Sequence, residues 1–244
     1  MLSNSLSIAN RIINQLIHDR RTLGLLVFAP LLIASIVGVS TPEKRVLDYT
    51  TPAMLGALIL FFGFLLTGIS FQRERSQGTL ERLMAAPVSR LDIVGGYVFG
   101  FLLFALAQTL IIFFYMVYVL DITHQGQIWQ IIIFQAIVGV GAVCLGTFAS
   151  TFARNEFQIA QFIPIFILPQ FFLCGLLWPV EQLPEYLQWI SKFLPLTYAV
   201  DGLREIMLHG KNLLDVWVEL SVLLGFAVVM SVLAALSLRR WTAG

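Results

Sequence analysis

The sequence has 244 residues, a net charge of +1 and a hydrophobic fraction of 58%. Charged residues account for 12% of it, about half the share of a soluble globular domain, and the mean hydropathy is +0.86. This composition excludes a soluble domain and indicates an integral membrane protein. The near-zero net charge gives no reason to expect nucleic acid as a partner.

Six apolar stretches are long enough to cross a bilayer as helices. A hydrocarbon core of about 30 Å requires about 20 apolar residues per helix. The expected spans are residues 22–40, 53–71, 93–120, 128–152, 157–177 and 220–238. Together they predict an all-α integral membrane fold with one transmembrane domain over residues 22–244.

Residues 1–21 are predicted to form an amphipathic helix that lies along the membrane interface. Apolar residues recur there at steps of three and four, which places them on one face of a helix. Arg20 and Arg21 would anchor the start of the first span. The expected apolar face comprises Leu2, Leu6, Ala9, Ile13, Leu16 and Ile17.

The polar segment 72–92, which we call the island, separates the second and third spans. It holds seven of the chain's 29 acidic and basic side chains, so it is expected to face water. Gly78 is predicted to end the preceding helix, Thr79 to cap a short new helix, and Pro87 to end that helix. The apolar edge of this short helix would consist of Leu80, Leu83 and Met84.

The second and third spans carry local signals of their own. Ser89 and Asp92 have the spacing of a capping box that opens the third span. Gly96 and Gly100 lie four residues apart in that span and permit close approach of another helix. The second span contains four aromatic residues, which by pattern are expected to face lipid more often than a ligand: Phe61, Phe62, Phe64 and Phe71.

The fourth and fifth spans differ in character. In the fifth span, Pro164 and Pro169 interrupt the backbone hydrogen bonds, so kinks or free carbonyl groups are expected. Small residues on one side of the fourth span predict tight packing against another helix. They are Gly139, Ala142, Gly146, Ala149, Ser150 and Ala153.

The segment 178–212 is predicted to form two short amphipathic helices that lie on, or dip into, the outer interface. Pro195 separates the two helices, and Gly210 is expected to end the second.

Cys144 and Cys174 both lie inside spans, so no disulfide framework is expected.

The distribution of Lys and Arg predicts the orientation of the chain. Ten basic residues lie on the side that carries both termini and the island, and five lie on the other side. Basic residues are enriched in cytoplasmic loops, so the N- and C-termini and the island are expected in the cytoplasm.

The island resembles the cytoplasmic coupling loop of type-2 ABC transporter permeases. In that family the loop docks on a separate ATPase subunit; the alternative interpretation is an ordinary solvated loop. The residues that carry the resemblance, and that it implies as ATPase-coupling residues, are Glu74, Arg75, Gly78, Thr79, Leu80, Glu81, Arg82, Leu83 and Pro87.

The stretches 175–181 and 194–198 resemble the external re-entrant helical hairpin of the same permeases, which here would occupy residues 178–212. The resemblance also implies that residues 1–21 are the family's connecting helix. It further implies a dimer of permeases, with two ATPase subunits and a cavity lined by the second and fifth spans. Candidate residues for the cavity and its gate are Phe61, Phe64, Phe171, Phe172, Leu176 and Leu177.

Several chemistries lack support in the sequence. The six predicted spans contain no Asp, Glu, Lys, Arg or His, which argues against coupling to ions. The chain also lacks the glycine-rich phosphate loop of an ATPase, so ATP and Mg²⁺ would bind the partner subunit and no cofactor is expected here. His18, His124 and His209 lack metal-ligand spacing, so we expect neither a metal site nor an enzyme.

The sequence therefore predicts the membrane subunit of an ATP-driven ABC exporter in the cytoplasmic membrane. The absence of charge in the spans favours a lipophilic or amphiphilic substrate, similar to those of drug- and antibiotic-export permeases. Export of a polysaccharide or lipid-linked glycan is the alternative substrate class. A non-transporting membrane scaffold or a channel is the alternative kind of protein.

Overall fold

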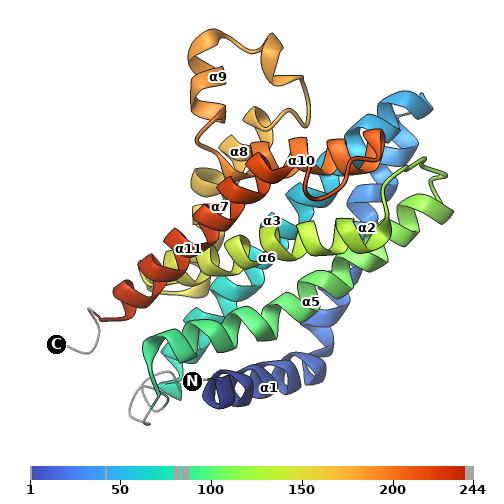
Figure 1. Cartoon of the computed structure of the whole chain (residues 1–244). Coiled ribbons are helices and arrows are strands. Elements are labelled where there is room, and N and C mark those ends of the chain that lie inside the picture. Colours follow the sequence, from blue (N-terminus) through green and yellow to red (C-terminus); the bar gives the residue numbers. More distant parts are fainter. Residues whose placement is uncertain (1, 42, 80–82, 84–87, 240–244) are drawn as a thin grey trace.

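The computed structural model describes residues 2–41, 43–79, 83 and 88–239, and within these ranges it contains helices and connecting turns but no strand. The longer helices run roughly alongside one another (Figure 1). Their bounds are α1 Leu2–His18, α2 Arg20–Ser40, α3 Lys44–Ser76, α5 Arg90–Tyr118, α6 Ile128–Ser150, α7 Glu156–Phe166, α8 Leu168–Leu173, α9 Glu185–Ser191, α10 Pro195–His209 and α11 Trp217–Arg239, with a short 3₁₀ turn, η1, over Val180–Gln182.

Six stretches of the described chain are long and apolar enough to cross a membrane: α2, α3, α5, α6, the α7–α8 pair and α11. The prediction of an all-α protein with six membrane-spanning helices is therefore confirmed. Helix α3 begins at Lys44, nine residues before the expected second span. The apolar stretch that starts at residue 53 is thus the continuation of a helix that is already formed.

Helices α3 and α6 form the buried centre of the bundle. They run side by side in the same direction, and a Cβ atom added at Gly63 would lie 2.9 Å from the Cβ of Ala142. A Cβ atom at Gly146 would lie 2.6 Å from the carbonyl oxygen of Phe64. The small-residue face predicted for the fourth span is thus confirmed, and its partner is α3.

The aromatic residues of α3 follow from this packing. Phe62, Phe64 and Phe71 are buried inside the chain, so the expectation that they mainly face lipid is wrong for these three. They are buried because α3 lies at the centre of the bundle, with neighbours on most of its sides. Phe61 is only partly buried.

Helix α1 packs lengthwise on the first turns of α5 (Figure 1). Ile8 lies against Gly96 and Ile12 against Gly100, so these two glycines provide the close approach that their spacing predicts. The predicted apolar face of α1 is wrong in part, because Leu6 and Ile17 are exposed. The groove that these two glycines form on α5 receives a partly different face of α1. The buried residues of that face are Ser5, Ile8, Ala9, Ile12 and Leu16.

The fifth span is broken at Ile167, between α7 and α8. Pro169 has no N–H to donate, and the side-chain amide of Gln170 donates to the carbonyl oxygen of Phe166 at 2.7 Å. The interruption predicted for this span is thus confirmed near Pro169, whereas Pro164 lies inside α7 and does not end it.

The two short helices in residues 178–212 lie in different surroundings. Helix α9 projects from the bundle with only Ser191 buried, whereas ten residues of α10 are buried. Helix α10 fits against α3 because Leu203 lies over Gly56, and against α6 because Phe134 lies over Gly202. Helix α10 is therefore part of the bundle, whereas α9 is not, and the position of either helix relative to the outer interface stays a prediction. The limits predicted for α10 at Pro195 and Gly210 are confirmed.

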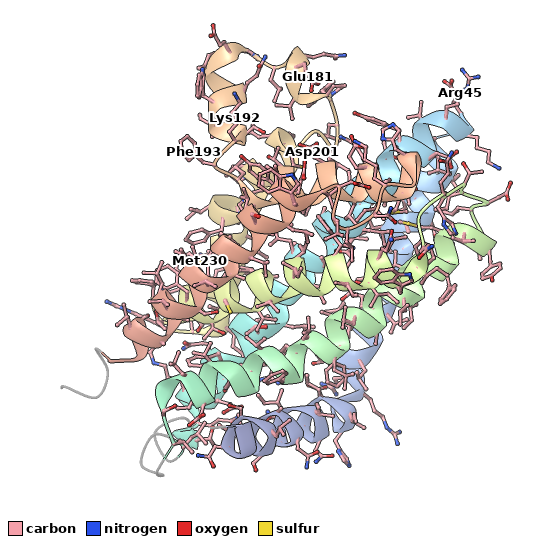
Figure 2. The ribbon with its side chains drawn as sticks, viewed as in Figure 1. Arg45, Glu181, Lys192, Phe193, Asp201 and Met230 are labelled. Carbon is pink, nitrogen blue, oxygen red and sulfur yellow. The ribbon has the colours of Figure 1, made fainter. Side chains whose placement is uncertain are left out.

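The bundle has two ends, the island end and the far end. The island end contains the end of α3, the start of α5 and helix α1. The far end contains the start of α3, α10 and the projecting α9 segment. Figure 2 shows Glu181, Lys192 and Phe193 on that projecting segment and Asp201 on α10.

Candidate functional site

The first part of the candidate site is the boundary of α3 with the island. Gly78 has a φ of +68°, a conformation that favours glycine, and the helix ends just before it at Ser76. The hydroxyl of Thr79 donates to the carbonyl oxygen of Glu74 at 2.8 Å, so it secures the end of α3. The capping contact predicted for Thr79 would involve residues that the structure does not describe.

The remaining island residues are placed only in part. Leu83 is partly buried and packs against the apolar core. The capping box at the start of α5 is confirmed, because Ser89 and Asp92 each accept a hydrogen bond from the other's backbone N–H. The predicted coupling residues that lie outside the described residues are Leu80, Glu81, Arg82 and Pro87.

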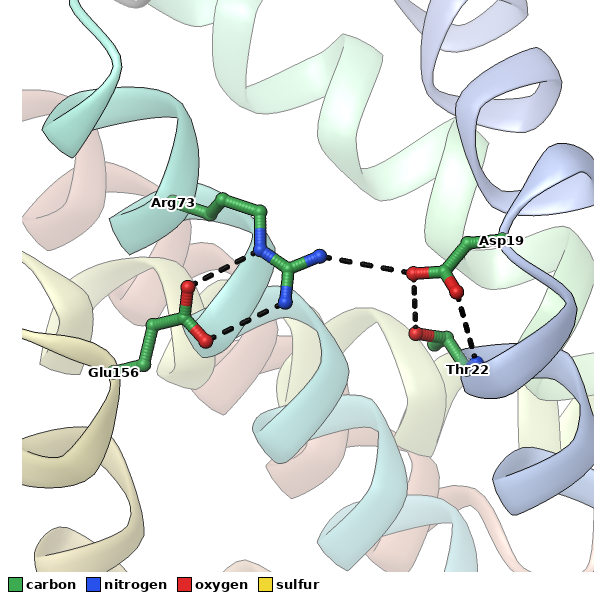
Figure 3. A network of polar contacts seen from close by, with 4 residues as sticks. All are labelled: Asp19, Thr22, Arg73 and Glu156. Atoms are coloured by element: carbon green, nitrogen blue, oxygen red, sulfur yellow. Dashed lines mark hydrogen bonds and ion pairs between the residues drawn. The ribbon is translucent and has the colours of Figure 1, made fainter.

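A network around Arg73 joins three helix ends at the island end (Figure 3). The guanidinium of Arg73 donates from Nε and Nη2 to the two carboxylate oxygens of Glu156, at 3.1 and 3.4 Å. Its Nη1 lies 3.7 Å from Oδ2 of Asp19. Asp19 in turn caps α2 by accepting hydrogen bonds from the backbone N–H and the hydroxyl of Thr22, which lower the pKa of its carboxyl group. Arg73 thus connects the start of α2, the end of α3 and the start of α7.

Two of the predicted coupling residues, Glu74 and Arg75, contact their own chain. The side chain of Glu74 is only 5% exposed and pairs with Arg11 of α1 at 2.5 Å. Arg75 donates to the carbonyl oxygens of Thr151 and Ala153, at 3.5 and 3.1 Å, in the turn that follows α6. These two charges therefore hold the end of α3 against α1 and the α6–α7 turn.

Sequence reasoning missed Arg11, Asp19, Arg73 and Glu156 as parts of this site. Asp19 and Thr22 have the spacing of a helix cap, which could have identified Asp19. Nothing in the sequence pairs Arg73 with Glu156, because 83 residues separate them and only the packing of α3 beside α7 brings them together.

The second part of the candidate site is a half-open apolar cavity of about 410 Å³ toward the far end. Helix α2 contributes Ile33 and Val37, and the α8 region contributes Phe171, Leu176 and Leu177. The remaining described lining residues are Thr41, Thr50, Met54, Ala57, Leu58 and Phe61. None of the described lining residues is charged, and only the two threonines carry a hydroxyl.

The structure brings together four of the six predicted cavity residues. Phe61, Phe171, Leu176 and Leu177 line the cavity, although they are far apart in the sequence. Phe64 does not line it, because this residue is fully buried beside Phe166, with ring centres 6.4 Å apart. Phe172 is half-exposed and also lies outside the lining.

The described residues contain no group of three His, Cys, Asp or Glu side chains that could hold a metal ion. Each histidine has a local partner instead. His18 lies 2.7 Å from the carbonyl oxygen of Asn14, His124 lies 3.1 Å from that of Gly126, and His209 pairs with a glutamate one turn earlier.

The chain is similar to a known family and to several known proteins. The family model described as ABC-2 type transporter matches residues 5–208. ABC transporter G family member 20 of Dictyostelium discoideum is 28% identical over 201 residues, which cover 82% of this chain and 28% of that protein. The linearmycin resistance permease protein LnrN of Bacillus subtilis is 28% identical over 182 residues, which cover 74% of this chain and 47% of that protein.

The probable multidrug ABC transporter permease YbhR of Escherichia coli is 27% identical over 181 residues, which cover 73% of this chain and 49% of that protein. The chain therefore spans less than half the length of these relatives.

Proposed function

Because this chain belongs to the ABC-2 type transporter family, we propose that it is the membrane subunit of an ATP-driven exporter. Its substrate would be a lipophilic or amphiphilic compound, similar to a drug or antibiotic, taken from the cytoplasm or the inner leaflet. The names of two relatives, a linearmycin resistance permease and a probable multidrug permease, support this class of substrate.

The apolar cavity is the observation that carries the proposal. It lies where the second span, the end of the broken fifth span and the first span meet, and its described lining carries no charge. Such a lining favours an apolar compound, because a charged group would lose hydration there without gaining a partner. Among the lining residues that the structure describes, only Phe61 and Phe171 are aromatic. We therefore favour a lipophilic substrate over a glycan, for which a continuous row of aromatic residues would be expected.

The energy for export would come from a separate ATP-binding subunit that docks at the island end. Two copies of that subunit and two copies of this chain would form the transporter, with both termini and the island in the cytoplasm. The contacts of Glu74 and Arg75 support this arrangement, because they fix the end of α3 to its neighbours. A push on the island would then reach α1, α3 and the start of α7 together.

Inside-out membrane vesicles that contain the chain and its ATP-binding subunit provide the test. We expect ATP-dependent uptake of a neutral lipophilic dye such as Nile red. Replacing Ala57 with Phe puts a ring into the cavity and should reduce the uptake at least about tenfold, since the apolar contacts of a bound compound are lost.

Val229→Phe serves as the matched control, because Val229 is half-exposed on α11 and lies outside the cavity lining. Both variants must be present in the membrane at the level of the parent chain. Uptake that does not depend on ATP would support a channel instead, and uptake no higher than in vesicles without the chain would support a scaffold. Equal uptake by Ala57→Phe and the parent would show that the substrate does not bind in this cavity during transport.

A further inference from the structure

Arg204 of α10 occupies an unusual position at the far end of the bundle. The residue is only 8% exposed, and its Nη2 donates to the carbonyl oxygen of Gly175 at 2.7 Å. Its Nε donates to the carbonyl oxygen of Tyr49 at 3.4 Å, and the guanidinium carbon lies 3.9 Å from the centre of the Tyr49 ring. One side chain therefore holds the start of α3 and the turn after α8.

Both segments held by Arg204 lead directly into the cavity wall. Thr50 follows Tyr49 and lines the cavity on the α3 side. Leu176 follows Gly175 and lines it on the side of the α8 region. Arg204 consequently joins the two segments that supply these lining residues, although it does not itself line the cavity.

The turn at Gly175 is shaped for this contact. Its φ is +81°, a conformation that L-residues rarely adopt, and a Cβ atom there would lie 3.1 Å from Nη1 of Arg204. Glycine therefore permits both the turn and the approach of the guanidinium. On the α8 side, the backbone N–H of Leu196 in α10 also donates to the side-chain oxygen of Gln170, at 3.3 Å.

The acceptors of Arg204 are neutral. No carboxylate within the described ranges lies within ion-pair distance of its guanidinium. A buried guanidinium needs directional acceptors to offset its lost hydration, and here two backbone carbonyls and an aromatic ring provide them. Opening this contact would therefore not break a direct ion pair, whose loss leaves an uncompensated buried charge.

We propose that Arg204 is a positioning residue that closes the far-end wall of the cavity by joining the start of α3 to the turn after α8. Separation of Arg204 from Gly175 would open the cavity toward the far end. The inference rests on the proposed function only where it takes the cavity to be the transport cavity.

The two native cysteines provide a direct test. Cys174 precedes Gly175, Cys144 lies in the middle of α6, and both are fully buried. The full chain in lipid nanodiscs is treated with N-ethylmaleimide, and the labelling rate of each cysteine is measured by peptide mass spectrometry. Opening of the turn should expose Cys174 alone, whereas general destabilisation should expose both cysteines.

We expect Arg204→Gln to raise the labelling rate of Cys174 at least about tenfold while Cys144 stays protected. A factor of about ten corresponds to the loss of one hydrogen bond from a charged group. Arg204→Lys keeps the charge but not the planar fork, so its effect should be smaller. Arg45→Gln is the matched control, because Arg45 is an exposed arginine near the start of α3 (Figure 2) and should leave both rates unchanged.

An unchanged Cys174 rate in folded Arg204→Gln, or an equal rise for both cysteines, would overturn the inference. If Arg204→Gln does not insert, Tyr49→Leu removes the ring under the guanidinium and should produce the same selective labelling. The labelling requires neither nucleotide nor substrate. Failure of ATP-dependent dye uptake by the parent chain would therefore count against the proposed function and leave this inference standing.

Discussion

Glu74 and Arg75 show how a charged pair in a recognisable motif can serve the chain itself. Both were candidates for contact with another subunit, yet each has its partners within the fold. Glu74 is nearly inaccessible, so this carboxylate is not free to meet another subunit. At the scale of single residues, Glu74 and Arg75 therefore form an anchoring part of the island. The proposed function would leave docking to the island residues after Gly78, which we call the docking part.

The anchoring part predicts a measurable stability effect. Replacing Arg11 with Met leaves the buried carboxylate of Glu74 without its partner and should reduce the free energy of unfolding by about 1–3 kcal/mol. Thermal unfolding followed by circular dichroism in detergent would measure it. Arg20→Met is the control, since Arg20 is exposed. The double variant Arg11→Met with Glu74→Gln should recover part of the loss; no recovery would contradict the pairing.

The docking part predicts an effect of Glu81 on coupling. If Glu81 meets a basic residue of the ATP-binding subunit, Glu81→Lys replaces attraction with repulsion and should weaken association by about 2 kcal/mol or more when the pair is desolvated. Co-purification of the two subunits and dye uptake would be measured in the same membranes. Normal values of both would indicate that the island is only a solvated loop, because exposed charges usually change stability by less than about 0.5 kcal/mol.

Leu176 and Leu177 allow a test of the cavity wall beside Gly175. Replacing both with Ala removes apolar side chains from the lining and should change dye-stimulated ATP hydrolysis or increase leak of dye across the membrane. Each buried methylene group contributes about 0.8 kcal/mol to binding an apolar compound. Leu236→Ala, on the exposed side of α11, is the control. If hydrolysis and leak both match the parent chain, these leucines do not form a gate.

At the scale of helices, glycine and alanine decide which helices touch. The groove of Gly96 and Gly100 receives α1, and Gly63, Gly68 and Gly146 bring α3 and α6 together. Van der Waals packing drives association between helices in a membrane, because lipid chains are as apolar as the helix surface. Small residues therefore fix the arrangement of this bundle more strongly than large apolar residues do.

Gly146→Ala tests this packing. The added Cβ would lie 2.6 Å from the carbonyl oxygen of Phe64, so α3 and α6 must separate, and we expect a loss of about 1–3 kcal/mol. Gly225→Ala in α11 is the matched control, because a Cβ there has no atom within 4 Å. Thermal unfolding of the two variants would be compared. Equal unfolding temperatures would show that the α3–α6 contact tolerates separation.

At the scale of the whole molecule, the six candidate spans differ in how far the chain itself buries them. Most of α3 and α6 and about half of α5 are buried inside the chain, whereas α2, the α7–α8 pair and α11 are largely exposed and apolar. Exposed apolar helices are stable in lipid or against another subunit. This distribution suits a chain that packs against lipid and a second copy, as the proposed function requires.

Orientation is the prediction that belongs to this scale. Cysteines introduced at Gln77 and Glu185, which are exposed at opposite ends of the bundle, should react from opposite sides of the membrane. In intact cells a membrane-impermeant maleimide should label Glu185→Cys only, because the basic residues favour a cytoplasmic island. Labelling of Gln77→Cys from outside would reverse the proposed orientation and remove the basis for coupling at the island.

The sequence by itself determined the features that depend on neighbouring residues. The six apolar stretches, the end of α3 at Gly78, the capping box of α5 and the break near Pro169 each follow from local backbone chemistry or from length and hydropathy. Four of the cavity residues were also identified from the sequence, through resemblance to a family.

The tertiary structure decided which of these features meet. The buried face of α1 depends on a groove in α5, and the position of α10 depends on glycines in α3 and α10. The Arg73 network and the contacts of Arg204 join residues 83 and 155 positions apart in the sequence. No local pattern encodes such pairs, because the free energy that selects them comes from packing complete helices against one another.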